Sequence, residues 1–102
     1  MFGADVPAQF TREYGCALAD WERDLPGAVG SHRLERPAAG QARVHLEPGG
    51  CLHLQWQALP PRQIALVRLP RLQVDFRFDA VTAEARAGLM RYFDLFMQRG
   101  GG

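Results

Sequence analysis

The sequence contains no lysine and no asparagine, and all twelve of its basic residues are arginine. Without lysine, the chain cannot form a Schiff base, a Walker A phosphate loop or a Ser-Lys dyad, because each needs that amine. Hydroxyl nucleophiles are scarce too, since Ser31, Thr11 and Thr82 are the only serine and threonine residues. Arginine in place of lysine is typical of a GC-rich, bacterial-like coding composition. These absences lean the interpretation away from an enzyme.

The sequence also has few cysteines and no long apolar run. Two cysteines, Cys16 and Cys51, are too few for a disulfide framework. The first ten residues lack the basic and apolar regions of a signal peptide. No apolar run approaches the roughly 20 residues that cross a bilayer. We therefore expect a cytoplasmic protein with no membrane segment and no resident cofactor.

The length and charge fit one ordinary globular domain. A chain of 102 residues with 47% hydrophobic and 23% charged residues buries a core without covalent staples. The net charge of +1 gives no general attraction to nucleic acid or to anionic membranes. Residues 1–50 carry 5 arginines against 7 acids, and residues 51–102 carry 7 against 4. This asymmetry is too weak to name a partner.

The segment 7–25 carries one apolar stripe at helical spacing, which predicts an amphipathic helix. The stripe is made by Phe10, Tyr14, Leu18, Trp21 and Leu25. We interpret it as core rather than as a binding surface. A Pro-Gly pair follows the predicted helix, and a short strand is expected over residues 31–35.

The segment 42–57 predicts a β-hairpin around the stretch HLEPGGCLH, residues 45–53. Apolar and polar residues alternate in both of its strands. A three-residue loop at 48–50 keeps the apolar face sorted by pairing Val44 with Leu54, whereas a two-residue turn mixes the faces. The hairpin therefore has one inward apolar face and one outward polar face.

Two further strands are predicted after the hairpin. Residues 63–69 are apolar on both faces, which is typical of a central strand covered on both sides. Residues 71–78 alternate, as in a strand with one wet face. Pro70 lies between them, and we expect it to make a turn, the alternative being a bend in one long strand.

The last element is a predicted helix over residues 83–99. Thr82 is its expected N-cap, and Gly100 ends it, followed by a flexible tail over 100–102. Its apolar residues sweep more than half of the helix circumference, whereas one sheet face needs only a stripe of about 100°. The helix must therefore touch something further, either the N-terminal helix or another copy of the chain.

The outward face of the hairpin gathers residue types that bind zinc. The predicted register opposes His45 to His53 and Glu47 to Cys51, with opposed Cβ atoms roughly 5 Å apart. An ordinary solvated face explains the same residues, and their spacing matches no familiar zinc pattern. One alternative function is therefore a metal-binding protein or a metal-dependent enzyme that uses these four residues.

Residue pairs suited to metal-free catalysis are few. Ser31 and His32 are adjacent, so on an extended chain they point to opposite faces. Cys16 has no predicted basic neighbour, which favours an inert thiol. Asp75 and Asp79 share a strand face with an arginine between them, which is typical of a charge-balanced surface.

A strip of four arginines is predicted across the last two strands, made by Arg62, Arg68, Arg71 and Arg77. Nucleic-acid binding through this strip is a third, weaker alternative. An RRM-like surface needs exposed aromatic residues and a βαββαβ order, and this chain has neither in prediction.

Together these elements predict an α+β domain over residues 1–102. It has an N-terminal helix, an antiparallel meander of three to five strands, and a C-terminal helix packed on one sheet face. We expect a small non-catalytic module that recognises protein, with a homodimer as one form. The expected interaction residues are Tyr92 and Leu95 on the last helix and Val67 and Leu69 on the doubly apolar strand.

Overall fold

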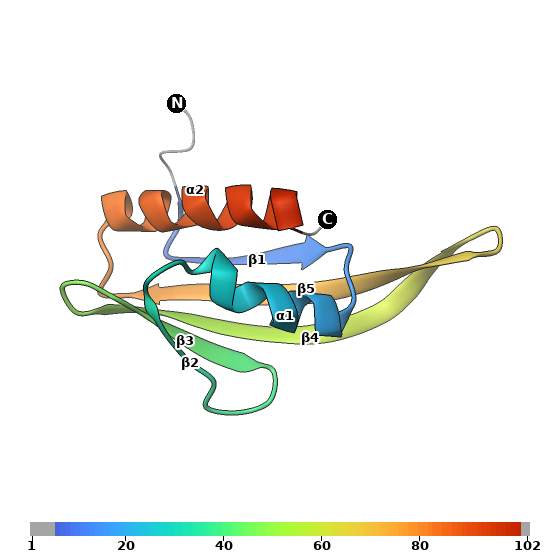
Figure 1. Ribbon diagram of the computed structural model, residues 1–102, viewed down its shortest axis with the longest axis horizontal. Coiled ribbons are helices and arrows are strands. Elements are labelled where there is room, and N and C mark those ends of the chain that lie inside the picture. Colours follow the sequence, from blue (N-terminus) through green and yellow to red (C-terminus); the bar gives the residue numbers. More distant parts are fainter. Residues whose placement is uncertain (1–5, 101–102) are drawn as a thin grey trace.

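The computed structural model describes residues 6–100, which form one antiparallel sheet and two helices (Figure 1). In chain order the elements are β1 (Gln9–Tyr14), α1 (Leu18–Ala28), β2 (Arg33–Glu35), β3 (Gln41–Leu46), β4 (Gly50–Ile64), β5 (Val67–Asp79) and α2 (Ala83–Gly100). The sheet order is β1-β5-β4-β3-β2. The predicted α+β class, with an antiparallel sheet and a helix near each end, is confirmed. Residues 101 and 102 of the predicted tail lie outside the described residues.

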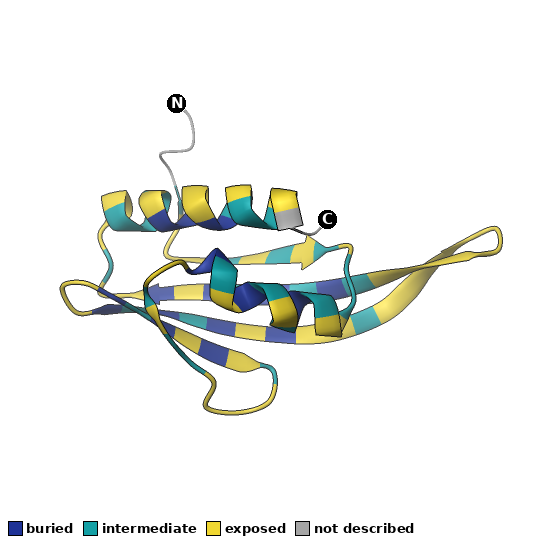
Figure 2. Ribbon diagram, viewed as in Figure 1, coloured by how far each residue is buried: buried dark blue, intermediate teal, exposed yellow. Residues whose placement is uncertain are grey.

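The core lies on one face of the sheet, and both helices cover that face (Figure 2). Alternate residues of the three central strands point into it, as the predicted strand period requires. The buried apolar side chains are Trp21, Leu25, Ala28 and Val29 in and beside α1; Ala42, Val44 and Leu46 of β3; Leu52, Leu54 and Trp56 of β4; Leu72, Val74, Phe76 and Phe78 of β5; and Leu89, Met90 and Phe93 of α2. The other sheet face carries polar residues.

The side chain of Trp21, on α1, contacts both the sheet and the second helix. Its ring centroid lies 5.3 Å from that of Tyr14 on β1, 5.6 Å from Trp56 on β4 and 5.9 Å from Phe93 on α2. The side chain is only 1% exposed. One aromatic residue of α1 therefore contacts the edge of the sheet, its centre and the other helix, in the tilted and edge-on geometries that aromatic pairs prefer.

The wide apolar arc of α2 is explained in part by α1. A Cβ atom added to Gly27 would lie 2.2 Å from the ring of Phe96, so the absence of a side chain at Gly27 lets the two helices meet. The start of α2 is capped as predicted, since Ala85 N–H donates to Thr82 Oγ1 at 3.1 Å. The second contact expected for this helix is therefore made by α1.

The prediction of a single helix over residues 7–25 is wrong in its first half. Residues Gln9–Tyr14 form the edge strand β1, and α1 begins only at Leu18. Phe10 and Tyr14 are four residues apart, a spacing that puts two residues on one side of a strand as well as of a helix. The segment forms a strand because it pairs with β5. In this pairing the rings of Phe10 and Phe76 stack with their centroids 4.7 Å apart.

The hairpin has the expected loop length, one residue earlier than predicted. Residues 47–49 form the loop, and Leu46 pairs with Gly50. Gly50 is buried, and a Cβ atom there would lie 2.5 Å from Val81 and 2.6 Å from the carbonyl oxygen of Ala80. The chain leading to α2 thus passes over Gly50 and requires it in the strand. The apolar residues stay on one face and the polar residues on the other. Each residue of β3, however, pairs with a residue of β4 two positions earlier than predicted.

The prediction of a covered central strand at 63–69 is also wrong. Strands β4 and β5 continue past their neighbours as a projecting hairpin, because β3 ends opposite Gln55 and β1 ends opposite Leu72. All of residues 60–70, here termed the arm, are exposed (Figure 2). Pro70 lies inside β5 rather than making a turn.

Replacing Leu52 by alanine should lower the free energy of unfolding by about 2–5 kcal/mol, because this fully buried leucine lies in the middle of the core. The same replacement at Leu66, on the arm, should change it by less than about 0.5 kcal/mol. Urea unfolding followed by tryptophan fluorescence at low protein concentration measures both. Equal effects at the two positions would contradict the one-sided core.

Candidate functional site

The arm is the most unusual surface of the molecule (Figure 1). At its tip Leu66 is 96% exposed, and Ile64 and Val67 beside it are more than half exposed. The turn forces Ala65 to a φ of 54°, a left-handed conformation that favours glycine. The chain thus adopts an unfavourable turn and exposes aliphatic side chains around it, a combination typical of an interaction surface.

The chemistry of the arm is apolar and basic. It carries Arg62 and Arg68, and no acidic residue occurs between Glu47 and Asp75. Pro60 and Pro61 lie within β4, and Pro70 lies within β5. Proline has no N–H to donate, so these residues oppose pairing of the arm edges with another strand. The arm can still contact a partner through its side chains.

The four predicted interaction residues lie on two surfaces. Val67 and Leu69 are on the arm, 55% and 41% exposed. Tyr92 and Leu95 are on α2, each 49% exposed. None of the four belongs to the core, and Leu66, the most exposed large apolar residue, was not singled out by the sequence pattern.

A small groove lies at the base of the arm. It has a volume of about 80 Å³ and is lined by Tyr14, Gly15, Cys16, Asp20, Trp21, Asp24 and Met97. Tyr14 pairs with Leu72, two residues beyond Pro70. The end of β1, the start of α1 and the end of α2 all face the side from which the arm projects (Figure 1). The groove is thus apolar inside and acidic at its rim.

The thiol of Cys16 reflects the character of this groove. Burial raises its pKa, and the nearby carboxylates of Asp20 and Asp24 raise it further. Burial likewise raises the pKa of the Cys51 thiol. A thiol with a raised pKa stays protonated and is a poor nucleophile. The groove is therefore suited to binding an apolar side chain rather than to thiol chemistry.

The sheet face away from the helices carries three basic side chains in a row. His53 on β4 lies opposite Arg43 on β3 and opposite Arg77 on β5. Side chains opposed in this way have Cβ atoms roughly 5 Å apart. Arg43, His53 and Arg77 are here termed the basic row. Among the residues that the structure describes, no carboxylate forms an ion pair with either arginine.

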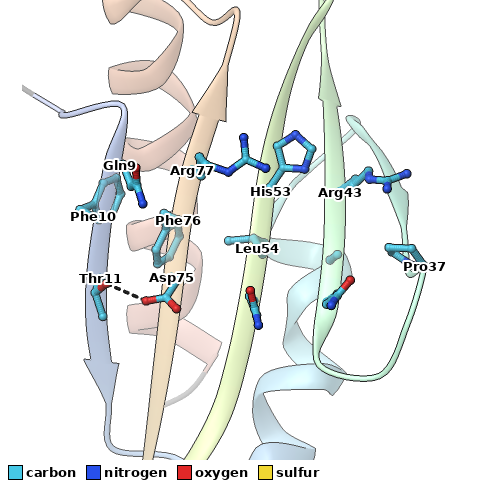
Figure 3. A pocket seen from close by; sticks show the side chains of 13 residues that line it. Gln9, Phe10, Thr11, Pro37, Arg43, His53, Leu54, Asp75, Phe76 and Arg77 are labelled. Atoms are coloured by element: carbon cyan, nitrogen blue, oxygen red, sulfur yellow. Dashed lines mark hydrogen bonds between the residues drawn. The ribbon is translucent and has the colours of Figure 1, made fainter.

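The basic row lines a shallow depression of about 490 Å³ (Figure 3). The guanidinium of Arg77 lies beside His53, whereas that of Arg43 extends toward Pro37 (Figure 3). Asp75 lines the same depression and accepts a hydrogen bond from the hydroxyl of Thr11 at 2.6 Å. The depression therefore presents cations at one end and neutral or acidic hydrogen-bonding groups at the other.

The pKa of His53 is affected by its position in the basic row. Burial lowers its pKa below 6.5, and the positive charges of Arg77 and Arg43 lower it further. The carboxylate of Asp79 opposes this lowering of the pKa without reversing it, so His53 resists protonation. Outside the row, Glu35 is already shared, because it accepts hydrogen bonds from His45 (2.6 Å) and Arg33 (2.9 Å), which lower the pKa of its carboxyl group.

The observed register leaves only two of the four predicted zinc ligands, His45 and Cys51, directly opposite each other. His45 lies opposite Cys51 instead of His53, and Glu47 falls in the loop. Across residues 6–100, no group of three His, Cys, Asp or Glu side chains is placed to hold a metal ion. Zinc binding by the hairpin stays a prediction.

The predicted arginine strip is not continuous. Arg71 donates two hydrogen bonds to Glu13 at 2.8 and 3.0 Å. Arg77 belongs to the basic row, and Arg62 lies on the arm. Arg68 lies on the opposite face of β5 from Arg71 and Arg77, which is the face on which Leu72 is buried farther along the strand. Nucleic-acid binding through these residues stays a prediction.

No protein-family model and no curated protein matches this sequence. Neither helix in the described part of the chain is both long and apolar enough to cross a membrane. Functional inference therefore depends on the arm, the groove and the basic row themselves.

The substitution Arg77→Gln should raise the pKa of His53 toward 6.5, because it removes the nearest positive charge. In the native protein the unfolded chain binds more protons than the folded one between the two pKa values, so stability falls as pH drops through 6.5. Arg77→Gln should weaken that fall. NMR titration of the His53 ring measures the pKa, and Arg68→Gln, on the arm, is the matched control that should leave it unchanged.

Proposed function

We propose that the protein is a non-catalytic interaction module that associates with a second copy of itself by exchanging arms. The tip of each arm inserts Leu66 into the groove of the other copy. The observation that carries this proposal is that one chain bears both halves of a complementary pair, a basic arm with an apolar tip and an apolar groove with an acidic rim.

The positions of arm and groove support a closed dimer. The arm strands, residues 60–64 and 67–70, have five and four residues, or roughly 15 Å at the usual strand rise. When two arms lie side by side and antiparallel, the tip of each reaches the base of the other, which is where the groove lies. A two-fold axis between the arms then makes both contacts at once and leaves none open for a filament.

The charges at the two ends are opposite. Arg62 and Arg68 have no acidic neighbour in the arm sequence. The groove rim carries Asp20 and Asp24, against the single Arg23 that pairs with both. Complementary charge favours encounter and fixes orientation more than it adds affinity. Burial of the aliphatic tip supplies the main stabilisation.

The extent of the contact fits a specific interface. The eleven arm residues and the seven groove residues together approach the roughly 20 residues per partner of a standard protein interface. Pairing of strand edges is not required, which agrees with the prolines on both arm strands. The interface is thus one of side chains placed in a pocket.

A cytoplasmic location is part of the same proposal. Cys16, in the turn before α1, and Cys51, on β4, are free thiols, and burial raises the pKa of both. Proteins of reducing compartments keep such thiols without forming bridges. An oxidising compartment would expose the groove thiol to modification and so disturb the proposed interface.

Sedimentation equilibrium tests the exchange of arms. The wild-type chain should show twice its 11.4 kDa mass, with a dissociation constant that Leu66→Asp raises by about a hundredfold or more, because two buried leucines are lost per dimer. Leu95→Asp, an equal change at an exposed residue of α2, should leave the mass unchanged. A monomeric wild type at millimolar concentration would overturn the proposal.

Charge reversal provides a sharper form of the test. A variant with Arg62→Glu and Arg68→Glu should be monomeric, and so should a variant with Asp20→Arg. Mixing the two should restore a dimer, because each arm then meets a groove of opposite charge. A mixture that stays monomeric, while both variants are folded by circular dichroism, contradicts the arm-to-groove contact.

A further inference from the structure

We propose that the basic row binds the phosphate group of a small sugar phosphate, with the sugar hydroxyls on the neighbouring polar side chains of the open sheet face. This site is separate from the arm and from the groove. It lies in the depression of about 490 Å³, a volume within the usual range for small-molecule sites.

The basic row is arranged for an anion. Arg43 and Arg77 flank His53 on both sides, so a protonated His53 would face a like charge across each strand pair, an arrangement that is destabilising. Within residues 6–100 neither guanidinium makes an ion pair: Glu35 beside Arg43 is engaged by Arg33 and His45. On the strand of Arg77, Asp75 accepts a hydrogen bond from Thr11, and Asp79 lies two residues further along without forming an ion pair with it. A bound anion would relieve this repulsion.

Phosphate suits the row better than a carboxylate. Guanidinium groups present planar forks of N–H donors that match phosphate oxygens. The Arg77 fork lies beside the His53 imidazole, and rotation of the Arg43 side chain back from Pro37 would bring a second fork to the same group, so that three oxygens could be engaged (Figure 3). A carboxylate offers only two oxygens in one plane and would leave one basic side chain unsatisfied.

The next row along the strands suits hydroxyl groups. It consists of Thr11, Asp75, Gln55 and Gln41, which follow one another in register across four strands. Two residues along a strand span about 6.7 Å, close to the distance from a phosphate to the ring of a sugar that carries it. The amides can donate to and accept from hydroxyls in this position, and the Asp75 carboxylate can accept from them.

The absence of an aromatic surface argues against a nucleotide base. Phe10 and Phe76 reach the depression only from strands whose aromatic rings point into the core, where they stack on each other. Bases are commonly held by stacking on aromatic rings. Across the described residues of the open face, no exposed aromatic side chain lines the depression, which favours a sugar phosphate over a nucleotide.

The test is an NMR titration of the full chain with ribose 5-phosphate at constant ionic strength. Amides of the basic row and of Thr11, Gln55 and Asp75 should shift with saturation, and the pKa of His53 should rise on binding. Arg77→Gln and Arg43→Gln should each weaken binding by about tenfold or more, because a charge-assisted contact is lost. Arg91→Gln, the same change on α2, should leave it unchanged.

Two comparison ligands divide the proposal into its parts. Inorganic phosphate should bind the basic row more weakly than ribose 5-phosphate, and ribose alone should produce no saturable shift. Equal affinity for both phosphates would overturn the role of the polar row. Shifts that chloride reproduces at equal ionic strength, or no shift at 10 mM, would overturn the site altogether.

Discussion

The packing of Trp21 is the contact on which the architecture depends. This one side chain bridges β1, the centre of the sheet and α2, and so draws both helices onto a single sheet face. Gly27 completes the arrangement by admitting Phe96 between the helices. A core built on one side leaves the other face of the sheet in water, and the stability of the fold does not depend on what binds there.

The surfaces used in the proposals lie at the edge of that core or outside it. The arm begins where β1 and β3 stop and carries no buried residue. The groove forms where β1 passes into α1, and the basic row occupies the wet face of the central strands. The rigid layer thus positions a proposed protein-binding element and a proposed anion site on different sides of the molecule. Substitutions in either should leave folding intact.

The sequence predicted the structure correctly in segments whose apolar pattern fits either a strand or a helix but not both. The alternation of the hairpin and of residues 71–78 assigned inward and outward faces that the structure bears out, including His53 and Arg77 on the wet face. It failed where spacing was ambiguous, as for Phe10 and Tyr14, whose separation suits a strand and a helix equally. It also failed where tertiary contact decided, as when the chain over Gly50 moved the loop and separated His45 from His53. For the arm, the three prolines were the signal against a covered central strand.

The central claim is that the tip of one arm enters the groove of another copy. An isotope-filtered NOE experiment tests it most directly, on a mixture of chains with ¹³C-labelled leucine methyls and chains with unlabelled aromatic residues and methionine. Arm exchange predicts intermolecular NOEs from the Leu66 methyls to Tyr14 and Met97. A dimer that shows NOEs only to other surfaces, or none from Leu66, would contradict the account.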